Sequence, residues 1–155
     1  MAAGAGVTGL AAAGCTVDNP VTKDKTPKPT ADLAPDVAVA SRALTEITAV
    51  REAAARTLSR HPGTRPALAP VVRMHRAHET SLADAVPRQA RPTATPAPYA
   101  VPRRREVALQ RLASRERRLH RTLDTLALRA QSGDFARLLA SMGTAVDQRL
   151  AGWPT

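Results

Sequence analysis

Residues 103–131 read RRREVALQRLASRERRLHRTLDTLALRAQ, a stretch in which apolar residues recur every three or four positions. This spacing places them on one face of a helix with 3.6 residues per turn. The face consists of Ala108, Leu112, Glu116, Leu119, Leu123, Leu126 and Ala130. The stretch therefore predicts a long amphipathic helix with a carboxylate, that of Glu116, in the middle of its apolar face.

Three other stretches carry the same period and predict helices over residues 33–60, 65–86 and 134–152. No stretch alternates apolar and polar residues as a half-buried strand does. Hydrophobic residues make up 43% of the chain and aromatic residues only 2%. A core of alanine, leucine and valine favours closely packed helices over sheets. We predict an all-α protein, an antiparallel four-helix bundle over residues 33–152.

The connections between the helices differ in length. Residues 61–64 predict a short turn, with Thr64 as the N-cap of the second helix. Ser132 or Asp134 can cap the fourth helix. Residues 87–102 carry five prolines and predict a long crossover linker between the second and third helices.

The N-terminal segment ends in LAAAGC, and Cys15 is the only cysteine of the chain. Small residues before a cysteine resemble a bacterial lipobox, in which the cysteine receives a lipid after signal-peptide cleavage. Residues 1–15 are thus interpreted as a truncated lipoprotein signal and residues 16–32 as a flexible Pro/Lys/Thr tether. Residues 1–14 lack Lys and Arg, so we expect the translation start to lie further upstream. The alternative is an unmodified Ala/Gly tail.

The formal charge of +10 and the pI near 11.4 predict an attraction to anions. With a lipid anchor at Cys15, we expect location at the cell membrane on the extracytoplasmic side. The expected partners are the membrane surface and, as candidates, anionic lipid or a wall polymer. Nucleic acid is not expected, because base-stacking aromatic residues are few and no helix-turn-helix spacing is present. The alternative is a cytoplasmic basic bundle that binds nucleic acid or a protein.

Four polar residues lie on or beside the inward faces of the expected helices: Arg51, His75, Glu116 and Arg149. Counting from the turns places them near one level of the bundle, so we predict a shared polar layer. Buried charges must be paired, and a carboxylate among two arginines and a histidine would meet this need. The layer would fix the register of the helices. The alternatives are side chains that reach solvent at the edge of the bundle, or a ligand site.

The order of lipobox, tether and four Ala/Leu/Arg-rich helices with His75-Arg-Ala-His78-Glu79 resembles ferritin-like lipoproteins of high-GC Gram-positive bacteria. The resemblance covers residues 33–152 at the level of the fold. Ferritin-like di-iron sites use a Glu-x-x-His motif on two helices, and this chain has none. Ferroxidase chemistry is therefore not expected, and His75, His78 and Glu79 are only weak candidates for a metal site.

No arrangement for catalysis is evident. No serine stands with a histidine and an acid, and no glycine-rich phosphate loop is present. We therefore expect no enzymatic activity and no cofactor. The expected function is that of a basic, membrane-tethered envelope lipoprotein with a binding or structural role, and the alternative to this role is a metal- or small-ligand-binding bundle.

Overall fold

The computed structural model describes residues 33–88, 91 and 98–153. The candidate lipidation site Cys15, the predicted tether at residues 16–32 and part of the linker, residues 89–90 and 92–97, lie outside the described residues. None of the helices in the described part is long and apolar enough to cross a membrane.

The described residues form four α-helices and no strand. The helices are α1 (Leu33–Arg60), α2 (Arg65–Ala85), α3 (Arg105–Ala127) and α4 (Gly133–Ala151), and a 3₁₀ turn, η1 (Pro62–Thr64), joins the first two. The prediction of an all-α protein with four helices packed against one another is confirmed.

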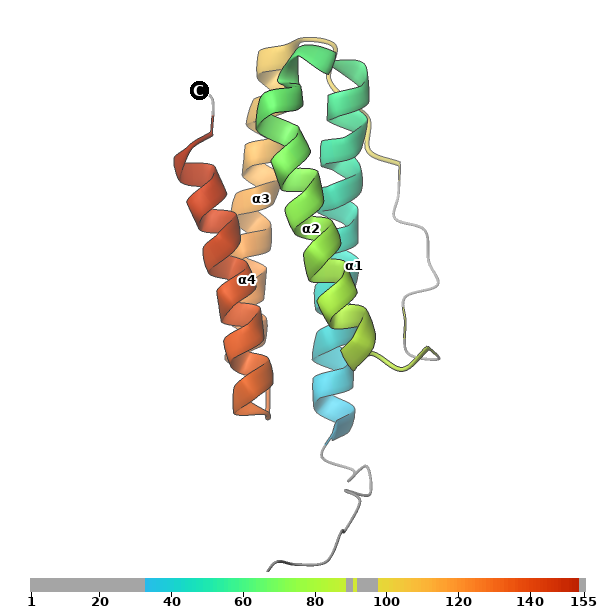
Figure 1. The fold of residues 1–155 in the computed structure, drawn as a ribbon, viewed down its shortest axis with the longest axis vertical. Helices are drawn as coiled ribbons and strands as arrows, with labels where there is room; N and C mark the ends of the chain where they lie inside the picture. The colour runs from blue at the N-terminus through green and yellow to red at the C-terminus, as the bar shows by residue number, and fades with distance from the viewer. Residues whose placement is uncertain (1–32, 89–90, 92–97, 154–155) are drawn as a thin grey trace, which may run out of the picture.

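The bundle consists of two helical hairpins that meet along one seam. α2 packs along α1, α4 packs along α3, and α1 packs against α3. Figure 1 shows that the chain rises through α1 and α4 and descends through α2 and α3. The first residue of α3 therefore lies at the opposite end of the molecule from the last residue of α2. The connection between them must run the length of the bundle, which explains why it is long.

Small residues on α1 allow the core to be close-packed. Ala43, Ala53 and Ala54 are fully buried on this helix, so its neighbours can approach its backbone. One buried cluster lies in the half of the bundle nearer the α3–α4 turn and includes Ile47 and Leu123. A second cluster lies nearer η1. Burial follows the predicted periodicity in all four helices.

Of the two predicted N-caps, the one at the start of α2 is wrong and the one at the start of α4 is present. Thr64 stands at the N-cap position of α2, but its hydroxyl makes no capping bond and donates to the His61 carbonyl instead, at 2.7 Å. The expected cap is wrong because Thr64 is the last residue of η1, with φ −86° and ψ 0°, and not the extended residue that an N-cap usually is. Ser132 does cap α4, accepting from the Phe135 N–H at 3.4 Å.

The third helix ends earlier than predicted, at Ala127, because a carboxylate from α1 binds the turn that follows it. Asp36, only 9% exposed, accepts the backbone N–H of Gln131 at 2.7 Å and that of Ser132 at 2.9 Å. These backbone N–H groups would donate to carbonyls four residues earlier if the helix continued, and Asp36 accepts them instead. Asp36 thereby fastens the start of α1 to the α3–α4 turn.

We predict that Asp36→Asn lowers the free energy of unfolding by about 1.5–3 kcal/mol, because one acceptor oxygen and the negative charge are lost from two backbone bonds. Urea denaturation followed by circular dichroism measures the change. Asp147→Asn, at an exposed site on α4, is the matched control and should stay within about 0.5 kcal/mol of the wild type. Equal effects of the two substitutions would contradict the structural role of Asp36.

Candidate functional site

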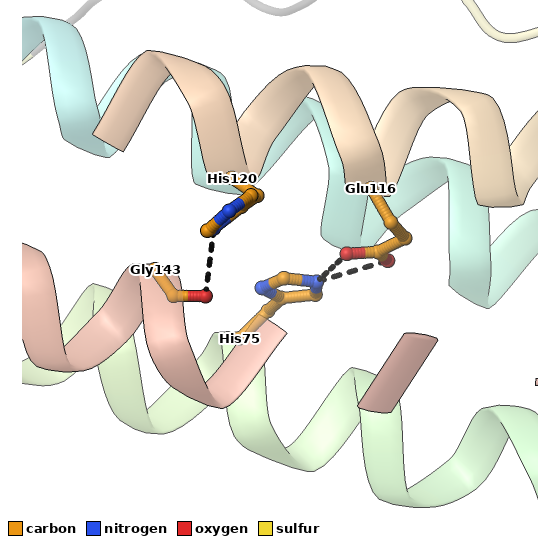
Figure 2. A network of polar contacts seen from close by, with 4 residues as sticks. All are labelled: His75, Glu116, His120 and Gly143. Carbon is orange, nitrogen blue, oxygen red and sulfur yellow. Dashed lines mark hydrogen bonds and ion pairs between the residues drawn. The ribbon is translucent and has the colours of Figure 1, made fainter. Parts of the chain in front are cut away.

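The centre of the bundle holds a histidine and a carboxylate in direct contact. His75 of α2 and Glu116 of α3 have 0% and 1% of their surface exposed. The His75 Nε2 lies 3.1 Å from Oε1 and 3.0 Å from Oε2 of Glu116, as Figure 2 shows. At these distances a proton must lie between the nitrogen and the carboxylate, because two bare acceptors would repel each other.

This pair joins two helices that do not pack on each other. α2 packs chiefly on α1, and α3 packs on α4 and α1. Helical periodicity turns both His75 and Glu116 inward, and the pair bridges the interior from one hairpin to the other. The predicted meeting of these two residues is thus observed, and it links the α1–α2 hairpin to the α3–α4 hairpin.

The two arginines of the predicted polar layer do not join this pair. Arg51 donates from Nε to Glu79 Oε1 at 2.8 Å, with side chains 22% and 19% exposed. Arg149 is exposed on α4. The predicted four-residue layer is therefore wrong as a single unit: the structure has a dry central pair, a mostly buried Arg51–Glu79 pair within the first hairpin, and a separate, exposed Arg149. The two arginines stay out of the centre because each lies at the margin of its helix face, where a guanidinium can keep contact with water.

His78 lies next to the central pair. Its ring meets that of His75 edge to face, with 5.9 Å between the ring centroids. Burial, followed by the proximity of His75, lowers the pKa of His78 from 6.5 to about 4. The Nδ1 atoms of both rings are buried and have no hydrogen-bond partner among the described residues.

The three weak metal candidates do not form a set of ligands. The Nε2 atom of His75 is occupied by Glu116, and Glu79 is paired with Arg51. In the described part of the chain, no three His, Cys, Asp or Glu side chains gather as a metal site requires.

A second polar contact crosses the α3–α4 interface beside the central pair. The His120 Nδ1 lies 3.1 Å from the Gly143 carbonyl oxygen, shown in Figure 2, and its Nε2 lies 3.4 Å from Asp124. A Cβ at Gly143 would lie only 2.9 Å from the Asp124 carboxylate. Glycine thus permits the close approach of the two helices. The sequence analysis missed this contact, although a glycine inside an amphipathic helix could have indicated it.

A hollow of about 700 Å³ lies where the N-terminal ends of α2 and α3 face the C-terminal end of α4. Leu109, Leu150 and Trp153 contribute apolar surface to it. Thr64 and Ser114 also line it, but its lining has no histidine among the described residues that could activate a hydroxyl. The hollow therefore offers a surface and not a set of reactive groups.

The central pair is closed to solvent, so no substrate can reach either group in this conformation. No family model, curated protein or solved structure matches the chain. The role of the pair is therefore inferred from its geometry alone, which is that of an internal link between two hairpins.

We predict that His75→Leu and Glu116→Leu each destabilise the protein by about 3–5 kcal/mol, because each leaves one polar partner buried alone. The double variant removes both polar groups and should recover most of the loss. A double-mutant cycle in urea measures the coupling. Strictly additive losses would contradict a direct interaction between the two side chains.

We also predict a histidine contribution to acid sensitivity. Folded His78 stays neutral down to about pH 4, whereas the unfolded chain takes up a proton near pH 6.5. Between these values the unfolded state binds more protons, so the free energy of unfolding decreases as the pH falls through this window. His78→Gln should flatten that decrease, measured by urea denaturation at several pH values. Curves of the same slope for both proteins would contradict the burial of a neutral His78.

Proposed function

We propose that this protein is an envelope lipoprotein, anchored to the extracytoplasmic side of the cell membrane through Cys15, with a binding or structural role and no catalytic activity. The observation that carries the proposal is the order LAAAGC, tether and helical bundle along the chain. A diacylated cysteine supplies at least two acyl chains, and two chains are what stable anchoring requires.

We further propose that the bundle is of the antiparallel, ferritin-like type. Support comes from the directions of the helices in Figure 1 and from the long linker between α2 and α3. Ferritin-like bundles use such a crossover between two helical hairpins. The proposed relation concerns the scaffold alone, because the interior holds a His–Glu pair in place of the carboxylates of a di-iron site.

The closed interior supports a role outside catalysis. His75 and Glu116 face each other and not a cavity, and both are buried. Reactive groups must meet their substrate within hydrogen-bond reach. A bundle whose most unusual polar groups serve its own packing is suited to act through its surface, which in this chain is rich in arginine.

The competing proposal is a cytoplasmic basic bundle that binds nucleic acid or a protein partner. Its support is the same positive charge of +10. The two proposals differ in the fate of the N terminus, because only the first requires cleavage before Cys15.

Expression of the full gene in a high-GC Gram-positive host tests the anchor. We predict that the protein is recovered in the membrane fraction, and that mass spectrometry finds an N-terminal peptide beginning at Cys15 and carrying a diacylglycerol. Because the chain has no other cysteine, Cys15→Ser should abolish the modification completely. An intact, unmodified peptide beginning at Met1 in the soluble fraction would reject the proposal.

A further inference from the structure

Four arginines surround one hollow on the outer seam between α1 and α3. The hollow measures about 260 Å³, and its cationic lining consists of Arg42, Arg118, Arg121 and Arg129. Arg42 comes from α1 and the others from the region of α3, so the hairpin contact itself creates the cluster. We call this site the arginine hollow.

The positive charge of the arginine hollow is not neutralised within the described residues. None of its four guanidinium groups forms an ion pair or a side-chain hydrogen bond there, and all four side chains are exposed. Asp124 of the same helix is engaged by His120. Glu46, one turn along α1 from Arg42, also forms no ion pair with them. Four neighbouring cations with free planar donors form a site for phosphate oxygens.

The arginine hollow lies in the half of the bundle where the chain enters α1. Arg42 is roughly 14 Å along the helix from Leu33, at 1.5 Å per residue. Asp36 holds the α3–α4 turn in this same half, at the lower end in Figure 1. The 17 residues between Cys15 and Leu33 can span at most about 60 Å in any conformation. A lipid on Cys15 would therefore keep the point where the chain enters α1 within about 60 Å of the bilayer.

An apolar side chain projects beside these arginines. Leu128 is 89% exposed, the one large hydrophobic residue that is so exposed in the described part of the chain. It precedes Arg129 in the turn after α3. A leucine next to an arginine suits a bilayer interface, where the apolar side chain can enter the acyl region while the guanidinium group binds phosphate.

We propose that the arginine hollow binds the phosphates of anionic phospholipid headgroups and that Leu128 inserts between them, which seats the tethered bundle with the lower part of its α1–α3 seam against the membrane. This inference rests on the proposed anchoring through Cys15, but its chemistry does not require the lipid. A nucleic acid fits the site less well, because the lining has no aromatic side chain for base stacking and Leu128 would have no apolar partner.

The test uses the full chain carrying Cys15→Ser, so that binding reports the bundle surface and not the anchor. Its partitioning is measured on vesicles of phosphatidylcholine and on vesicles of phosphatidylcholine mixed with phosphatidylglycerol. Arg42→Gln/Arg121→Gln removes two charges from the arginine hollow. Arg73→Gln/Arg76→Gln removes two exposed charges from α2 and is the matched control, since the net charge of both variants is equal. Circular dichroism verifies that each variant is folded.

We expect binding to the anionic vesicles only. Binding should weaken about 30-fold in the hollow variant, because two contacts between arginine and the anionic surface are lost. In the control variant it should weaken less than about threefold. Leu128→Gln should weaken vesicle binding about tenfold, because an apolar contact with the acyl region is lost. The same substitution should leave binding to a soluble polynucleotide unchanged.

Three results would overturn the inference. One is an absence of binding of the unlipidated chain to anionic vesicles. Another is an equal loss in the hollow and control variants, which would show that only net charge matters. The third is tighter, hollow-dependent binding to a polynucleotide than to the vesicles. Each is distinguishable from a failure of the proposed anchoring, which is decided by the modification of Cys15 in cells.

Discussion

The bundle depends on one buried contact, the hydrogen bond between His75 and Glu116. Each hairpin, α1–α2 and α3–α4, has its own internal packing, but the two meet mainly along α1 and α3. The pair crosses the remaining interior, where neither group could stay without the other, since burial of an unpaired ionisable side chain is costly. This requirement selects the relative position of the hairpins in which the two residues face each other, as polar layers select register in coiled coils.

That position of the hairpins determines what the surface presents. With α1 and α3 in contact, Arg42 comes to lie beside the arginines of α3, and Asp36 reaches the backbone of the α3–α4 turn. The turn then holds Leu128 outward at the end where the chain enters the bundle. The interior is thus closed to substrates, while the outside carries arginines and one exposed leucine. Such an exterior is suited to binding a membrane surface.

Much of the fold could be predicted because the helices repeat a simple period. The inward positions of His75 and Glu116 follow from that period alone. To predict their contact, one must also know how far the two hairpins are shifted along each other. The long linker between α2 and α3 does not determine this shift. Arg149 was placed at the margin of its helix face, where periodicity cannot separate burial from exposure. Asp36 and Arg42 were missed because their roles depend on partners far along the chain that only tertiary packing brings near.

The central claim is that the ring N–H of His75 is hydrogen-bonded to Glu116 in a dry interior. Nuclear magnetic resonance of the ¹⁵N-labelled His75 ring tests it directly, by following exchange of the Nε2-bound proton with water. The account predicts a resolved proton whose exchange is as slow as that of the most protected core amides, because it is released only by global unfolding. Rapid exchange with solvent under native conditions would contradict the buried pair.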